Sequence, residues 1–180
     1  NNTNVFCCAA LGNVLSGTFY IDLTGVFPIV SLEGKHAYYI AYDYGTNAIT
    51  PKAVPVFKNG TIMKTFEEVF TELKTTGYTP TLNVTDNQVT RPIKEFLRKE
   101  NCKWKVVEPS DRRVTAVERA SQTYKNHFIS GLASTGSHWP LQLWDHMTEQ
   151  AAITLNLLRI SRLDASKSAY KQLHLSLIHI

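Results

Sequence analysis

The chain has 180 residues, of which 43% are hydrophobic and 19% charged, and its formal net charge is +4. These values are typical of one globular domain with a full apolar core, and they argue against a chain of two domains. No apolar run approaches the roughly 20 residues that a membrane-spanning helix requires, which excludes that class of protein.

The net charge is unevenly distributed along the sequence. Residues 1–90 contain 5 Lys/Arg and 7 Asp/Glu, whereas residues 91–180 contain 14 Lys/Arg and 8 Asp/Glu. A basic second half suits a phosphate-bearing partner, and a solvated basic face explains it equally well.

Three strands are expected first, at residues 17–25, 35–45 and 48–56, because these segments are rich in β-branched and aromatic residues between turn signals. The short connections favour an antiparallel meander. The apolar spacing then becomes helical over residues 61–77, where Gly77 ends the helix.

Strands and helices alternate in the rest of the chain. The expected elements are a strand at 79–88, a helix at 91–101, a strand at 102–109, and helices at about 115–132 and 141–158. The order β-β-β-α-β-α-β-α-α predicts an α/β fold with a five-stranded mixed sheet, an antiparallel meander plus parallel strands, and helices on both faces.

Two apolar stripes mark the helix faces that the core should cover. The first stripe consists of Val117, Ala120, Tyr124 and Phe128. The second consists of Trp144, Met147, Ala151, Leu155 and Leu158. We expect both stripes to fill the core, with subunit contact as the alternative for the second.

Three carboxylates stand out by position: Asp22 near the end of the first strand, Asp86 at the end of the fourth, and Glu118 in the first turn of the long helix. If the first and fourth strands are neighbours, the two aspartates lie side by side and the helix can bring Glu118 opposite them. Clustered carboxylates repel unless a divalent cation neutralises them, and hard oxygen ligands select Mg²⁺ or Mn²⁺. Two such ions about 4 Å apart suit phosphodiester chemistry.

Each carboxylate also has a structural interpretation. Asp22 precedes Thr-Gly and could open a turn, and Asp86 could cap the following helix. The sequence "TAVE", Thr115 to Glu118, fits a capping box in which the glutamate binds the threonine amide.

The order and flanks of these residues carry a resemblance to a known family. The blocks "YIDLTG", "VTDNQ…IKEFL" and "VVEPSDRRVTAVERASQTYKNHF", with "HWPLQLWDHMTEQAAITLNLLR" and "SAYKQL" downstream, resemble the retroviral-type integrase core, specifically that of copia-type long-terminal-repeat retrotransposons. The resemblance implies a ribonuclease H-like fold and a catalytic, metal-binding DDE triad of Asp22, Asp86 and Glu118. It also implies two Mg²⁺ or Mn²⁺ ions that serve in trimming element DNA ends and joining them to target DNA.

The resemblance also bears on organisation and partners. We expect a catalytic core at residues 17–172, a linker from an upstream region at 1–16, and a tail at 173–180 of native or non-native origin. Double-stranded DNA and further copies of the chain are the implied partners, and the nucleus, reached through a cytoplasmic virus-like particle, is the implied location. Three cysteines without a CxxC pair agree with a reducing compartment.

Basic residues near Glu118 are the candidates for contacting DNA phosphates: Arg112, Arg113, Arg119 and Lys125. A solvated helix face is the alternative for them. Two alternative functions also remain open, a nucleic-acid-binding relic without catalysis and a ribonuclease H-type nuclease.

Overall fold

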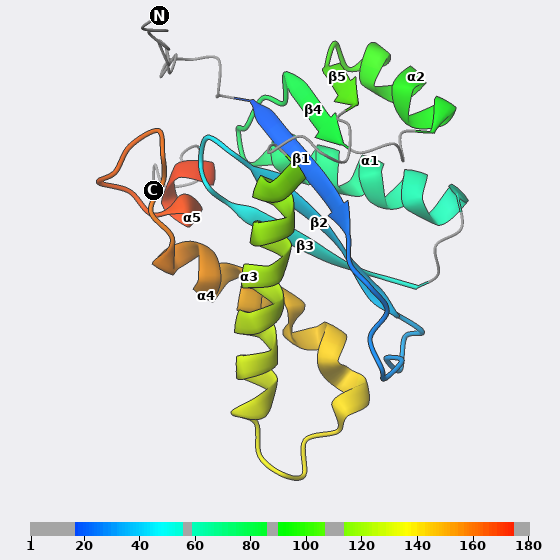
Figure 1. The fold of residues 1–180 in the computed structure, drawn as a ribbon, viewed down its shortest axis with the longest axis vertical. Coiled ribbons are helices and arrows are strands. Elements are labelled where there is room, and N and C mark those ends of the chain that lie inside the picture. Colours follow the sequence, from blue (N-terminus) through cyan, green and yellow to red (C-terminus); the bar gives the residue numbers. More distant parts are fainter. Residues whose placement is uncertain (1–16, 56–58, 86–89, 107–113, 175–180) are drawn as a thin grey trace, which may run out of the picture.

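The computed structural model describes residues 17–55, 59–85, 90–106 and 114–174. Five strands form one sheet in the order β3-β2-β1-β4-β5 (Figure 1). The strands are β1 (Thr18–Leu23), β2 (Ala37–Asp43), β3 (Ile49–Val54), β4 (Leu82–Thr85) and β5 (Lys103–Val106). Each lies within a segment predicted to be a strand.

The pairing of the strands confirms the predicted mixed sheet. β1 with β2 and β2 with β3 are antiparallel, whereas β1 with β4 and β4 with β5 are parallel. Tyr20 of β1 is paired with Val84 of β4, so the first and fourth strands are neighbours, as the carboxylate argument required. Because β1 and β4 are parallel, their carboxyl ends lie at the same end of the sheet.

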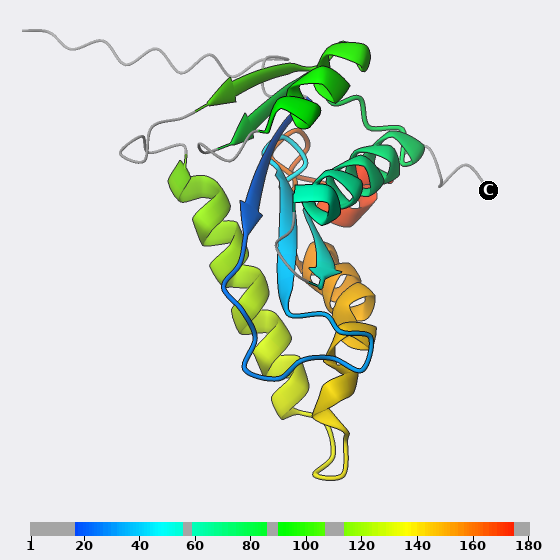
Figure 2. The same cartoon turned by 90° about the vertical axis from the view of Figure 1, so that its right-hand side faces the viewer.

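Helices cover both faces of the sheet (Figure 2). They are α1 (Asn59–Thr75), α2 (Arg91–Lys99), α3 (Val114–Ala133), α4 (Thr148–Leu158) and α5 (Ala169–Leu173), with a 3₁₀ helix, η2 (Leu141–Met147), before α4. In the described residues no helix is long and apolar enough to cross a membrane.

Each face of the sheet has its own core. On the side of α1 and α2, Phe19 of β1 packs against Phe66 and Phe70, with Leu97 of α2 in the same cluster. Ala169 and Leu173 of α5 complete this core, although the sequence had not predicted α5. Its N-cap is Ser168, whose hydroxyl accepts a hydrogen bond from the Lys171 amide at 3.1 Å.

The core on the side of α3 and α4 is rich in aromatic residues. Tyr38 of β2 makes edge contacts with Tyr124, Phe128 and Trp144, and Phe27 stacks on Trp144 with ring centroids 4.6 Å apart. All four apolar residues predicted for α3 are buried here. This packing fixes α3 against β1 and β2 (Figure 1).

The prediction of one helix over 141–158 was wrong. The segment begins as η2, with three residues per turn, and becomes an α-helix at Thr148. Of its apolar stripe, Trp144, Ala151 and Leu155 are buried and Met147 is half-buried, as predicted, whereas Leu158 is 76% exposed. Leu158 is the last residue of α4, where the chain turns to an extended conformation at Arg159, and none of the described elements covers it.

Candidate active site

Asp22 lies in β1, opposite Ile40 of β2. Side chains alternate along a strand, so Asp22 shares the α3 face with Tyr20, while Phe19 and Ile21 pack on the α1 side. The Asp22 carboxylate is half-buried on the helix-covered face. The structural interpretation in which Asp22 opens a turn does not fit, because Asp22 lies within β1 and is paired with Ile40.

Ser121 of α3 holds the Asp22 carboxylate. Its hydroxyl donates a hydrogen bond to Asp22 Oδ2 at 2.6 Å, and Ser121 is only 3% exposed. This contact orients the carboxylate and fixes the rotation of α3 about its axis. Ser121 was not among the predicted site residues, because a serine inside a helix carries no signal until the carboxylate opposite it is known.

Glu118 precedes Ser121 by three residues and therefore lies on the same side of α3, toward the β1 carboxylate. Its side chain is exposed. The described part of α3 already includes Val114, so Thr115 lies inside the helix, whereas a capping-box threonine precedes the first helical residue. The observed helix start thus argues against the capping-box interpretation.

The remaining predicted residues divide into two groups. Asp86, Arg112 and Arg113 lie outside the described residues. Arg119 is exposed and Lys125 is half-buried on α3. β4 is described to Thr85, directly before Asp86 in the sequence, and it runs parallel to β1.

No described cationic side chain neutralises Asp22 or Glu118, so both carboxylates are available to bind a metal ion. Among the described residues, neither forms an ion pair with a lysine, arginine or histidine. A half-buried carboxylate and an exposed one on facing elements provide hard oxygen donors, and no cationic side chain of the described residues is paired with them. This donor set fits Mg²⁺ or Mn²⁺.

A second group of possible ligands lies away from this site, in the β1–β2 loop and η2. In the described part of the chain, Glu33, Asp145 and His146 have donor atoms within 4.8 Å of one another. Asp145 Oδ2 accepts a hydrogen bond from the Ser31 hydroxyl at 2.8 Å. Two of the three side chains, Glu33 and His146, are exposed, and such groups are common without an ion.

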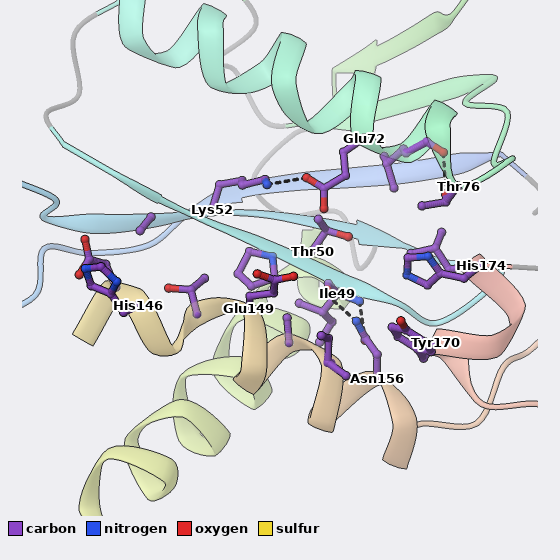
Figure 3. Close-up of a pocket in the computed structure, with 18 of the residues that line it drawn as sticks. Ile49, Thr50, Lys52, Glu72, Thr76, His146, Glu149, Asn156, Tyr170 and His174 are labelled. Carbon is purple, nitrogen blue, oxygen red and sulfur yellow. Dashed lines mark hydrogen bonds and ion pairs between the residues drawn. The ribbon is translucent and has the colours of Figure 1, made fainter. Parts of the chain in front are cut away.

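A pocket of about 550 Å³ lies between β3, α1, α4 and α5 (Figure 3). The ion pair of Lys52 with Glu72, at 2.5 Å, forms part of its wall. His174 lines it too, and burial lowers the pKa of that imidazole while Glu72 acts in the opposite direction. None of the described residues predicted for catalysis or DNA binding lines this pocket.

Comparison with known proteins gives matches at the level of structure. No protein-family model and no curated protein sequence matches the chain. The catalytic core of BIV integrase superposes with a TM-score of 0.66 at 14% identity, over 91% of this chain and 97% of that one. The HTLV-2 integrase core in complex with magnesium, in a dimeric form, gives 0.66 at 19% identity, over 91% and 99%.

A larger assembly gives a similar result. A chain of the simian T-cell lymphotropic virus intasome, in complex with PP2A regulatory subunit B56 gamma, has a TM-score of 0.70 at 14% identity, over 91% of this chain and 56% of that chain. These TM-scores show that the fold described above is shared with these structures. The chain therefore has the ribonuclease H-like fold of retroviral integrase catalytic cores.

Proposed function

We propose that the chain is the catalytic core of a DDE-type polynucleotidyl transferase, an integrase of a copia-type retrotransposon. Its substrate would be double-stranded DNA, with element ends trimmed and then joined to target DNA. The observation that carries the proposal is the hydrogen bond from Ser121 to Asp22. It turns the side of α3 that bears Glu118 toward the only carboxylate of β1.

Asp22, Asp86 and Glu118 would hold two Mg²⁺ or Mn²⁺ ions. When bound, such ions activate the attacking oxygen and stabilise the leaving oxygen of a phosphodiester. Within the chain, Ser121 keeps Asp22 in one orientation, and the aromatic core behind α3 keeps Glu118 at a fixed depth. A preorganised site of this kind loses little free energy to reorganisation during the reaction.

Arg112, Arg113, Arg119 and Lys125 would bind DNA phosphates beside the carboxylates. Contacts of this kind recognise the backbone, so binding would be tolerant of sequence and sensitive to salt. The exposed position of Arg119 supports this role.

The proposal includes assembly and location. The HTLV-2 integrase core is described in dimeric and trimeric forms, which supports a homo-multimer here. We propose nuclear action after passage through a cytoplasmic particle, with residues 17–172 as the catalytic core, 1–16 as a linker and 173–180 as a tail. Leu173 is the last residue of α5 and is buried in the core, so it packs with the catalytic core although the predicted tail begins there.

The test is a strand-transfer assay with short DNA duplex ends, a plasmid target and Mn²⁺. Asp22→Asn, Asp86→Asn and Glu118→Gln should each abolish joined products, because each removes a carboxylate ligand. Asp164→Asn is the matched control, since Asp164 is an acidic residue in the exposed loop before α5 and should be dispensable.

Three outcomes would contradict the proposal. Full activity in any of the triad variants would refute the triad. DNA binding without strand transfer in the unaltered chain would indicate the non-catalytic relic. Cleavage of the RNA strand of a hybrid, in place of DNA joining, would indicate the nuclease.

A further inference from the structure

The segment of α2 and β5 contains a concentration of positive charge. Residues 90–106 include six Lys/Arg and two Asp/Glu, a net charge of +4 that equals that of the whole chain. Part of this charge is paired, since Arg91 lies 3.0 Å from Glu95. The described residues provide no ion-pair partner for the two lysines of β5.

Strand register places these lysines on the same face as Asp22. Lys103 and Lys105 are paired with Leu82 and Val84 of β4, and Val84 is paired with Tyr20 of β1. Registered neighbours project to the same face, and Val84 and Tyr20 belong to the core beneath α3. Both lysines therefore project from the α3 face, about 10 Å across two strand spacings from β1.

Trp104, between the two lysines, fixes this orientation. Its ring packs against the core on the other face, and the guanidinium of Arg98 lies 5.8 Å from the ring centroid. The strand cannot slip by one residue without exposing the tryptophan and burying two ammonium groups. The cations of α2 consequently belong to the opposite face of the sheet.

Among the described residues, no helix covers the α3 face at β5. α3 packs on β1 and β2, and its first turns lie near the carboxyl end of β4 in both views (Figures 1 and 2). Lys103 and Lys105 are both exposed. Residues two apart on a strand are about 6.6 Å apart along it, so the two ammonium groups can reach neighbouring phosphates of one DNA strand.

We propose that Lys103 and Lys105 form a phosphate-binding track on which a DNA duplex lies as it approaches Asp22. The proposal rests on the proposed function for the identity of its ligand. It adds a DNA contact on the side of the carboxylates opposite to β2, beyond the basic residues near α3. A nucleic-acid backbone is the occupant that fits best, because Lys103 and Lys105 are positively charged and project from the same face of the sheet as Asp22.

The test compares two charge-matched double variants of the full chain. Lys103→Gln/Lys105→Gln removes the track, and Lys94→Gln/Lys99→Gln removes the same charge from α2 on the opposite face. Binding of each to a 20-base-pair duplex of random sequence is measured by fluorescence anisotropy over a range of salt concentrations. The slope of log K against log salt is negative, and each lost phosphate contact reduces its magnitude by about 1.

The track predicts that the magnitude of the slope falls by about 2 for the β5 variant and by less than half as much for the α2 variant. Equal slopes in the two variants would overturn the proposal. Lysines on an edge strand can also serve only to prevent strand pairing between molecules. In that case the β5 variant would self-associate in sedimentation with an unchanged slope, which would also overturn the proposal.

The occupant and the proposed function are tested separately. Stronger competition by polyglutamate than by duplex DNA, matched for charge, would indicate an acidic protein partner and refute the track. The slope measurement needs no catalysis, so it can be repeated with Glu118→Gln. If the slopes support the track but the unaltered chain shows no strand transfer, only the proposed function is refuted.

Discussion

The two edge strands of the sheet, β3 and β5, differ in whether other parts of the chain cover them. At the β3 edge, Asn156 of α4 accepts a hydrogen bond from the Ile49 amide at 2.9 Å and donates one to the Ile49 carbonyl at 2.8 Å. Its side chain thus replaces a neighbouring strand, and it is 6% exposed. At the β5 edge, Lys103 and Lys105 are exposed, and none of the described helices packs over them.

This difference shows how one sheet can serve both stability and binding. Unpaired backbone groups at an edge invite association, and proteins either cover such edges or place charge on them. The covered β3 edge is fixed within the fold. The charged β5 edge stays accessible next to Asp22, where a DNA substrate would have to approach.

The largest effect is expected where the covered edge is opened. Asn156→Leu leaves the amide and carbonyl of Ile49 buried without partners, and the free energy of unfolding should fall by about 2–4 kcal/mol. Urea denaturation followed by circular dichroism measures the change. Asn126→Leu on the exposed side of α3 is the matched control and should change stability by less than about 0.5 kcal/mol. Similar losses in both variants would refute the edge-sealing role.

A smaller effect is expected at the β2–β3 turn. Asp43 is 3% exposed, and its Oδ1 accepts a hydrogen bond from the Tyr78 hydroxyl at 2.6 Å. Tyr78→Phe should lower the free energy of unfolding at pH 7 by about 1.5–3 kcal/mol, because the hydrogen bond is to a carboxylate. Tyr170→Phe, which removes a hydroxyl from α5, provides the comparison.

The loss of stability in Tyr78→Phe should depend on pH. Burial raises the pKa of Asp43, and the hydrogen bonds from Thr46 and Tyr78 oppose that rise. Because the folded pKa exceeds the unfolded one, this group's contribution to stability is complete below about pH 4 and is lost as pH rises through the folded pKa. Tyr78→Phe raises the folded pKa further, so the loss relative to the unaltered chain should be larger at pH 7 than at pH 4. An equal loss at both would contradict this assignment.

The smallest effect on stability is expected at the boundary between the covered and open parts of the α3 face. Ser121→Ala removes the hydrogen bond to Asp22 and should cost about 1 kcal/mol in unfolding free energy. If Ser121 positions Asp22, strand transfer should slow while duplex affinity stays constant. Ser130→Ala on the same helix also loses a helical hydroxyl and is the control. Unchanged strand transfer in Ser121→Ala would limit Ser121 to a structural role.

Much of the fold followed from periodicity in the sequence. The β-branched and aromatic residues between turn signals predicted β1, and the helical stripe of Val117 and Tyr124 predicted α3 and its buried face. Register beyond the meander could not be predicted, because the pairing of β4 with β1 depends on contacts between distant segments. The prediction of one α-helix over residues 141–158 failed because an apolar stripe does not distinguish a 3₁₀ turn from an α-helix when both bury Trp144.

The candidate site was predictable to a similar degree. Asp22 and Glu118 were identified from their positions in a strand and a helix, and the described residues place them on facing elements. Ser121 was missed because a serine inside a helix carries no signal until the carboxylate opposite it is known. Asp86 was identified from the sequence, and its role stays a prediction.

The sequence by itself determined the order of the five strands, the buried stripe of α3 and the identity of the candidate carboxylates, since these depend on local patterns of side chains. Only the tertiary structure decided which side of α3 meets Asp22, which edge Asn156 covers and which face Lys103 and Lys105 occupy. These features join residues about 100 positions apart or lie across several strands. Such contacts depend on how whole elements pack, which local pattern does not specify.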